Sequence, residues 1–291
     1  MNDFYKTKNI PCFGVAGNFT GHLEQAGEAA DFKNVKTAEQ NAPKAVFPTF
    51  LPLSQNSASG ELIPQFLTVF PFDAEKIIFP KNEEKLQIEP ECAIVFNAVW
   101  NGDTLTQLVP VCFGASNDCS IRKQGAKKIS EKKNWGNASK GFSKNLIQFE
   151  NEPFTLKSKI NDYRIASFLL RNGEIYIYGE DSAVRGYSYF YEKLISWLLE
   201  KFNTQKNEGP AEDIHSYLIE AGQPSQIMVS VGATRYTEWG EHNFLQSGDT
   251  AIVAVYPESK YTPQEIHSLA KNPAALLNKD DISALVQTVK Q

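Results

Sequence analysis

Two glutamates stand one residue apart in the stretch LQIEPECAIVF at residues 86–96. Alternate side chains of a β-strand share a face, so Glu89 and Glu91 would point to one side, where the residues that follow are apolar. Two carboxylates at the mouth of an apolar core repel each other, and partial burial strengthens the repulsion. A hard divalent cation such as Mg²⁺ or Mn²⁺ relieves this because it takes oxygen ligands. The alternative is an exposed strand end with two solvated glutamates, which Pro90 favours because prolines occur at strand edges.

A third carboxylate follows the next apolar strand. The segment SNDCSIRK at 116–123 comes directly after VPVCFGA, at a position where a loop on a rigid strand can carry function. Asp118 can supply another oxygen ligand, and Arg122 can orient or neutralise the carboxylates. Further on, Lys140 precedes Gly141 in a loop and can hold a substrate carboxylate as a point charge. The alternative for Lys140 is an ordinary solvated lysine.

A candidate general base lies upstream, in the glycine-punctuated stretch GVAGNFTGHLEQAG at 14–27. His22 and Glu24 in this stretch can together activate a water molecule. The chain has four histidines, of which His215 and His267 are expected at the surface, while His242 in a glycine-bearing loop stays a candidate. No Gly-x-Ser-x-Gly stretch is present, which argues against a serine hydrolase.

The elements that must position these side chains are mostly strands. Turn residues at Asn101-Gly102-Asp103 predict a hairpin of 86–96 with 105–116, and Asn172-Gly173 predicts another within 165–179. Two more strands are expected at 227–233 and 249–256. Helical periodicity is present at 187–202, with Ser188 as a possible cap, and at 211–222. A capping box at Thr262 starts a further helix, and 282–290 is interpreted as a weak amphipathic helix.

These patterns predict a strand-rich α+β fold. Residues 1–80 are rich in proline and aromatic residues and are expected to pack on a core as loops and edge strands. Residues 81–258 would form that core, and residues 259–291 a C-terminal helical extension. The three segments are expected to form one structural unit.

Composition excludes several classes of function. Of the 291 residues, 42% are hydrophobic and 22% charged, with a net charge of −5 and no basic stripe, so we expect no nucleic-acid partner. No apolar window is long enough for a membrane-spanning helix, and no signal peptide is recognisable, so we expect a cytoplasmic protein without a membrane partner. The four cysteines form no CxxC pair and are expected to be reduced and buried.

The order of these motifs resembles that of the fumarylacetoacetate hydrolase superfamily. The likeness spans about residues 12–257 and rests on GNFTGHLEQ, Glu89-Pro-Glu91, Asn117-Asp118-Cys-Ser120-Ile-Arg122, Lys140-Gly-Phe-Ser143, NGEIYIYG and the closing stretch Phe244–Asp249. The resemblance implies a mixed β-sandwich roll with a few peripheral helices, and a homodimer. It also implies Mg²⁺ or Mn²⁺ held by Glu89, Glu91 and Asp118.

The resemblance further implies an activity. Family members cleave C–C bonds in acylpyruvate-like diketo acids, hydrate unsaturated oxo acids or decarboxylate oxaloacetate-like acids. The chain is thus expected to be a divalent-metal-dependent hydrolase or lyase whose partner is a small oxo or diketo acid, acting through a metal-stabilised enolate. Lys140 would hold the substrate carboxylate, and His22 with Glu24 would be the water base.

Departures from the family pattern mark a divergent member. His22 and Glu24 are two residues apart rather than three, with Gln25 at the expected position. Ser143 replaces an aspartate, and the T-G-T-P substrate turn reads Val231-Gly232-Ala233-Thr234, which moves the hydroxyl to Thr234. One alternative is therefore a non-catalytic relative that binds a metal or ligand. Another is a metal-free β-sandwich binding module, which requires Glu89 and Glu91 in bulk solvent.

Overall fold

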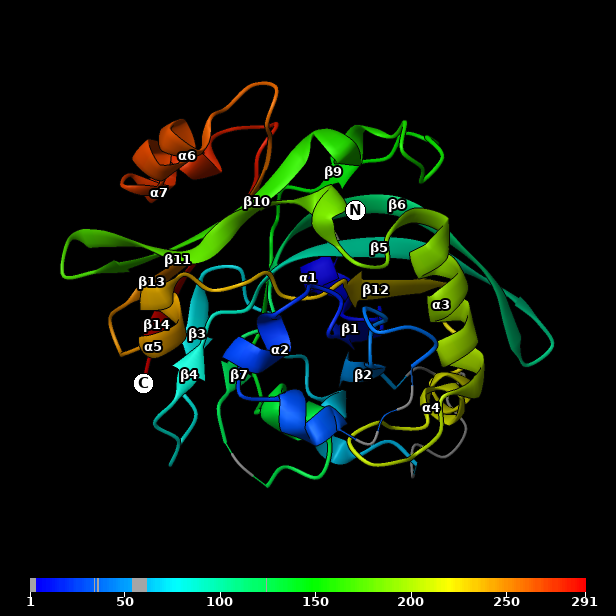
Figure 1. Cartoon of the computed structure of the whole chain (residues 1–291). Helices are drawn as coiled ribbons and strands as arrows, with labels where there is room; N and C mark the ends of the chain where they lie inside the picture. The colour runs from blue at the N-terminus through cyan, green and yellow to red at the C-terminus, as the bar shows by residue number, and fades with distance from the viewer. Residues whose placement is uncertain (1–3, 34, 36, 54–61, 124) are drawn as a thin grey trace.

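Two curved, mixed β-sheets pack against each other and form the body of the protein (Figure 1). The computed structural model describes residues 4–33, 35, 37–53, 62–123 and 125–291. The strand-rich α+β architecture predicted from the sequence is confirmed. All neighbouring strands are antiparallel except two pairs, which makes both large sheets mixed.

The larger sheet carries the site and has seven strands. In spatial order these are β2 (Ala45–Phe50), β1 (Cys12–Ala16), β12 (Gln226–Ser230), β5 (Pro90–Asn101), β6 (Thr104–Asn117) and β8 (Gly141–Phe142), with β9 (Ile147–Gln148) also paired to β6. The predicted hairpin around Asn101-Gly102-Asp103 is confirmed, with β5 and β6 as its strands. Gly102 adopts a φ of 55° in this turn, a conformation that glycine adopts readily.

The smaller sheet has five strands, and a two-stranded ribbon lies beside the site. The order is β11 (Glu174–Ala183), β10 (Tyr163–Arg171), β13 (Thr250–Pro257), β14 (Ser283–Lys290) and β3 (Lys76–Ile78), and the ribbon pairs β4 (Leu86–Gln87) with β7 (Ser120–Ile121). The second predicted hairpin is also confirmed, with Asn172 and Gly173 both at positive φ between β10 and β11.

The two sheets approach closely where β6 meets β14. A Cβ atom on Gly114 would lie 2.6 Å from Ser283 Oγ, so only glycine allows this approach. The Ser283 hydroxyl instead accepts a hydrogen bond from the Ala115 backbone N–H at 2.9 Å. A core of buried aliphatic and aromatic side chains, among them Ile94, Phe113 and Leu285, fills the space around this contact.

The helices lie around the sheets (Figure 1). The α-helices are α1 (Phe4–Thr7), α2 (His22–Gln25), α3 (Tyr191–Thr204), α4 (Ile214–Glu220), α5 (Glu238–His242), α6 (Pro263–Ala270) and α7 (Pro273–Leu277). Short 3₁₀ turns are η1 (Ala29–Phe32), η2 (Gln65–Thr68), η3 (Ile129–Lys132), η4 (Lys159–Asp162) and η5 (Val184–Gly186). The Thr262 capping box is confirmed, since its side chain accepts a hydrogen bond from the Glu265 N–H. Within the described ranges, no helix combines the length and apolar character needed to cross a lipid bilayer.

Two helix predictions need correction. The helix predicted at 187–202 begins only at Tyr191, because the preceding residues form a 3₁₀ turn and an extended N-cap at Phe190, so Ser188 is not its cap. The segment predicted as a helix at 282–290 is strand β14, which pairs with both β13 and β3. Its short apolar run is compatible with both helical and strand periodicity, and pairing with β13 makes it a strand. The C-terminal extension is therefore helical only in α6 and α7.

Candidate active site

Three carboxylates converge where β5 begins and β6 ends. The antiparallel register pairs Pro90 with Asn117, so the residues on either side, Glu89 and Asp118, meet directly. The Asp118 N–H donates to the Glu89 carbonyl at 3.1 Å. Ligand oxygens of Glu89, Glu91 and Asp118 all lie within 4.8 Å of one another. Two separate sequence motifs thus form one acidic triad, which we define as these three residues.

The triad is buried. Glu89, Glu91 and Asp118 are 4%, 1% and 2% exposed, so the metal-free binding module, which required solvated glutamates, is ruled out. Burial together with the neighbouring Asp118 and Glu89 raises the pKa of Glu91 well above its usual value. Burial also opposes ionisation of Glu89, yet Lys133 and Arg122 hold its pKa well below the usual value. Cationic neighbours therefore stabilise the charged form of Glu89, whereas the surroundings of Glu91 favour its neutral form.

Three cationic side chains neutralise Glu89 and Asp118. Lys133 Nζ lies 2.6 Å from Glu89 Oε2 and 2.8 Å from Asp118 Oδ2. Arg122 Nη2 lies 2.8 Å from Glu89 Oε1, as expected for a residue that neutralises the cluster. Lys140 Nζ lies 3.2 Å from Asp118 Oδ1 and also donates to the Cys119 carbonyl. Every oxygen of Glu89 and Asp118 thus has a cationic neighbour.

Lys140 is buried, so the alternative that it is an ordinary solvated lysine does not hold. It is 1% exposed, and burial lowers its pKa although Asp118 opposes this effect. Its ammonium group lies 5.1 Å from the centre of the Trp135 ring. As far as the described residues define the cavity beside the triad, Lys133 lines it and Lys140 does not. The role expected for Lys140, gripping a substrate carboxylate, stays a prediction, and Lys133 is the lysine that the structure places at the cavity.

Glu91 is oriented by the backbone after β12. The Gly232 N–H donates to Glu91 Oε2 at 2.8 Å. Gly232 has a φ of 124°, which residues with a Cβ rarely adopt. Although this turn reads Val231-Gly232-Ala233-Thr234 rather than T-G-T-P, it keeps the glycine whose N–H holds the Glu91 carboxylate.

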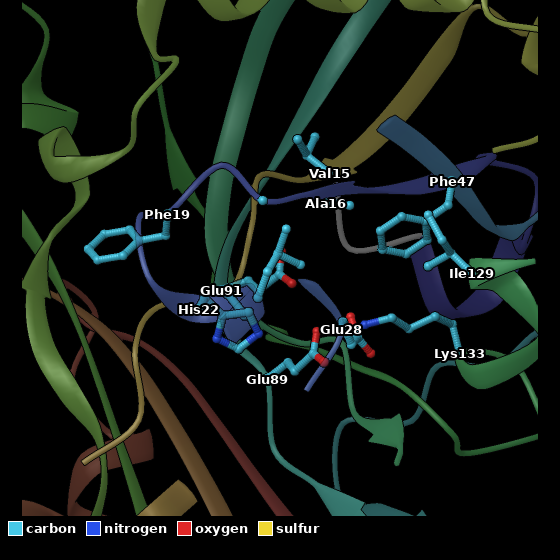
Figure 2. A pocket seen from close by; sticks show the side chains of 13 residues that line it. Val15, Ala16, Phe19, His22, Glu28, Phe47, Glu89, Glu91, Ile129 and Lys133 are labelled. Carbon is cyan, nitrogen blue, oxygen red and sulfur yellow. Dashed lines mark hydrogen bonds and ion pairs between the residues drawn. The ribbon is translucent and has the colours of Figure 1, made fainter. Parts of the chain in front are cut away.

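His22 lies beside Glu89 and Glu91, at the start of α2 (Figure 2). Its Nδ1 lies 2.9 Å from the carbonyl oxygen of Thr234, and burial lowers its pKa. Because a carbonyl only accepts, Nδ1 carries the proton and Nε2 keeps its lone pair in the neutral ring. Neither His22 Nε2 nor Thr234 Oγ1 has a hydrogen-bond partner among the described residues. A ligand or water beside the triad could therefore form hydrogen bonds with both of these buried atoms.

Glu24 does not join this group. The side chain is exposed, whereas His22 on the same short helix is buried. Positions two apart on a helix point to opposite sides, so the pairing of His22 with Glu24 expected from the sequence is wrong. Glu28 is the additional buried carboxylate here, pairing with Arg122 at 2.9 Å and with Lys132 at 2.8 Å.

Several residues of the site escaped the sequence analysis. Lys132 and Lys133 lie in KKISEKK, a run of charges typical of a solvated surface, and Glu28 lies in no motif. Tyr236, whose hydroxyl accepts from Arg122 at 2.7 Å and donates to the Ile88 carbonyl at 2.9 Å, likewise carried no signal. No pattern in KKISEKK marks its last two lysines, Lys132 and Lys133, as buried.

The enclosed space beside the triad is small. A cavity of about 20 Å³ is lined by residues that include His22, Glu28, Glu89, Glu91 and Lys133 (Figure 2). That volume is room for roughly one water molecule. A cleft of about 830 Å³ shares Glu28 with the cavity and is also lined by Arg122 and Lys132. The ion pairs of Glu28 thus stand between the cavity and the cleft.

The donor set suits a hard divalent cation. Three carboxylates at the start of β5 and just after β6 provide oxygen ligands, the ligand type of Mg²⁺ and Mn²⁺. Both Asp118 oxygens lack a hydrogen-bond donor among the described residues, although lysines lie within ion-pair distance. Lys133 is the feature that a cation would have to displace or tolerate.

Comparisons with known proteins agree with this architecture. The structure of the protein Cg1458 with an inhibitor aligns with a TM-score of 0.56 at 12% identity, over 97% of this chain and 77% of that one. The structure titled 2-keto-3-deoxy-D-arabinonate dehydratase complexed with magnesium and 2,5-dioxopentanoate aligns with a TM-score of 0.52 at 13% identity, over 96% and 72%. At these identities the likeness concerns the fold. No curated protein matches the sequence.

The chain shares its fold with these two structures, and the fold class that the motif order predicted is confirmed. Within that fold, the chain belongs to a family of unknown function (DUF5718), whose family model matches residues 28–289.

Proposed function

We propose that this protein is a divalent-metal-dependent enzyme that acts on a small oxo or diketo acid by C–C bond hydrolysis, hydration or decarboxylation. The observation that carries the proposal is the buried convergence of Glu89, Glu91 and Asp118. A bound Mg²⁺ or Mn²⁺ would supply Lewis-acid polarisation of the keto and carboxylate oxygens of such an acid. The magnesium and oxo-acid ligands named for the similarly folded dehydratase support this choice of substrate class.

The residues of this chain have separate roles in the proposal. Glu89, Glu91 and Asp118 would hold the cation, and Gly232 fixes the carboxylate of Glu91. His22 would take a proton at Nε2, since Thr234 occupies Nδ1.

Access for the substrate is a further requirement. An oxo acid is larger than a cavity of about 20 Å³. In this proposal the Glu28 side chain and its partners Arg122 and Lys132 would therefore move aside, so that the cavity opens toward the neighbouring cleft. Lys133 would then be the cation nearest to the acid group of the substrate. Lys140 supports Asp118 in this arrangement.

The test is an ultraviolet assay with metal-depleted protein. Acylpyruvates, unsaturated oxo acids and oxaloacetate are offered before and after addition of Mn²⁺, alongside Glu91→Gln. This substitution is the cleanest removal of a ligand because Glu91 is held by a backbone N–H and its loss leaves the ion pairs of Lys133 intact. Mn²⁺-dependent turnover that Glu91→Gln abolishes supports the proposal. Absence of turnover across the panel with Mn²⁺ bound favours the second candidate.

The second candidate is a non-catalytic relative that keeps the fold and binds a metal or ligand. The observation that favours it is the small cavity, which has room for about one water molecule. The exposed position of Glu24 also leaves His22 without the carboxylate expected beside it.

Assembly and location belong to the same proposal. We propose a homodimer in the cytoplasm, supported by the family resemblance of the motifs. Light scattering of the purified protein tests the dimer, and a monomer mass would contradict it.

A further inference from the structure

We propose that the ammonium group of Lys133 and a divalent metal ion compete for the acidic triad. Lys133 pairs with the triad when no metal is bound. This inference rests on the proposed metal site and concerns how that site is regulated. It predicts that metal binding and the Lys133 ion pairs are mutually exclusive.

The contacts of Lys133 support exclusion. Its ammonium group bridges two of the three triad members, at 2.6 Å from Glu89 and 2.8 Å from Asp118. The side chain is 3% exposed and lines the small cavity together with Glu91, the third member. A cation held by all three carboxylates would therefore sit next to the ammonium group, and like charges at such a distance repel strongly away from water.

Formal charge leads to the same conclusion. Within the described residues, the buried network contains four carboxylates and four cationic groups, namely Glu28, Glu89, Glu91 and Asp118 against Arg122, Lys132, Lys133 and Lys140. The cationic groups thus equal the carboxylates in number even when Glu91 is counted as ionised. A divalent ion adds two positive charges to this buried group, and withdrawal of one ammonium from the triad offsets half of that addition.

The other cations cannot play this part equally well. Arg122 is held by Gln87, Glu28 and Tyr236 as well as by Glu89. Lys140 also donates to the Cys119 carbonyl, and the described lining of the cavity does not include it. Lys133, by contrast, has ion pairs to the triad and an aromatic neighbour, Phe47, 5.2 Å away. Its side chain is therefore the one whose displacement breaks the fewest other contacts.

The experiment is a Mn²⁺ titration of metal-depleted protein, followed by electron paramagnetic resonance, for the parent and for Lys133→Met. Methionine keeps a flexible, unbranched side chain, one atom shorter than that of lysine, without its charge. We expect the affinity for Mn²⁺ to rise by about tenfold or more. The metal-free variant should also melt at a lower temperature than the metal-free parent and regain the difference with Mn²⁺.

Two further variants keep the result specific. Lys132→Met removes an equally buried ammonium one residue away, which pairs with Glu28 at 2.8 Å, and should raise the Mn²⁺ affinity by much less than Lys133→Met does. Lys133→Arg keeps the charge and should not raise the affinity. If Lys133→Met does not fold, Lys133→Gln serves in its place, and unchanged or weaker Mn²⁺ binding in the folded variant overturns the inference.

The outcome separates this inference from the proposed function. Tighter Mn²⁺ binding by Lys133→Met without turnover of any oxo acid supports the inference and contradicts the function. Mn²⁺-dependent turnover by the parent with no gain in affinity for Lys133→Met contradicts the inference alone. Failure of both the parent and Lys133→Met to bind Mn²⁺ overturns the inference and the metal site together.

Discussion

His22 Nδ1 lies 2.9 Å from the carbonyl oxygen of Thr234, across 212 residues of sequence. This contact fixes the tautomer, because the carbonyl accepts a hydrogen bond from Nδ1–H and leaves Nε2 as the base. Burial lowers the pKa of His22, so the neutral ring predominates at neutral pH. The histidine is thereby prepared to take a proton beside the triad.

Substitution of His22 tests this role. We expect His22→Asn to lower kcat by about 10²–10⁴-fold, the usual contribution of a general base. Mn²⁺ affinity should stay within a few-fold, because His22 is not a triad member. Steady-state kinetics on the oxo acid that the parent converts, together with Mn²⁺ titration, measure both quantities.

Glu24→Gln is the matched control. Glu24 lies on the same short helix but is exposed, so its variant should keep the kcat of the parent. If Glu24→Gln loses as much activity as His22→Asn, the assignment of His22 as an unassisted base is contradicted.

A buried carboxyl away from the triad predicts a pH-dependent stability. Burial raises the pKa of Glu212 to about 7, with one oxygen accepting from the Ser130 hydroxyl at 2.7 Å. Because the pKa in the folded state exceeds that of the unfolded chain, near 4.5, this group stabilises the fold below pH 4.5 and loses that effect as the pH rises through 7. The contribution at stake is about 3 kcal/mol.

Urea unfolding at pH 5 and pH 8 measures this contribution. The free energy of unfolding of the parent should fall more between these values than that of Glu212→Gln, which cannot ionise. Equal pH dependence of the two proteins would contradict the burial of Glu212 as a neutral acid.

Much of the fold and the triad was predictable from the sequence because the signals are local. Asn101-Gly102-Asp103 and Asn172-Gly173 fix two hairpins by turn chemistry alone. The first hairpin places the residues before β5 opposite those after β6, which is why Glu89 and Asp118 meet. The Glu-x-Glu and Asn-Asp motifs suggested a shared site, and the order of motifs along the chain was needed to predict all three carboxylates as ligands.

The parts that escaped prediction depend on tertiary contacts. Lys133 looks solvated in KKISEKK, and only its approach to Glu89 and Asp118 makes it part of the site. Strand β14 contains too few residues to distinguish strand from helix periodicity, and its place beside β13 decides the outcome. The expected pairing of Glu24 with His22 was missed for a local reason, since α2 turns the Glu24 side chain away from His22.

The glycine that orients Glu91 gives a second stability prediction. Gly232→Ala should destabilise the protein by about 1–3 kcal/mol, because a φ of 124° is unfavourable for alanine and the new Cβ would lie 3.1 Å from Asn18 Cβ. Mn²⁺ binding should weaken as well, since the N–H that holds Glu91 shifts. Chemical denaturation and Mn²⁺ titration measure the two effects.

Gly27→Ala provides the comparison. Its φ of 70° is a left-handed conformation that other residues also visit, and no atom lies within 4 Å of the new Cβ among the described residues. The loss of stability should be smaller than for Gly232→Ala, and Mn²⁺ binding unchanged. The reverse order would show that Gly232 has no special role.

Asp249, the last residue of the Phe244–Asp249 stretch, is expected to stabilise the fold rather than to take part in catalysis. Arg171 binds both oxygens of Asp249, at 2.8 and 2.7 Å, and Asp249 is 3% exposed. Asp249→Ala should lower the free energy of unfolding by about 2–4 kcal/mol because it leaves a partly buried guanidinium without its partner. Removing the exposed pair of Lys144 by Glu75→Ala should cost much less. Similar losses in the two variants, measured by urea unfolding, would contradict this account.

The most direct test of the central claim is the stoichiometry of Mn²⁺ binding by metal-depleted protein, measured by electron paramagnetic resonance of the free ion. The account predicts one Mn²⁺ per chain for the parent and a loss of affinity of about a hundredfold or more in Glu91→Gln, since one of three charged ligands is removed. Exposed Glu24→Gln should bind like the parent. Binding that is unchanged in Glu91→Gln, or absent from both the parent and Lys133→Met, would contradict the assignment of Glu89, Glu91 and Asp118 as a metal site.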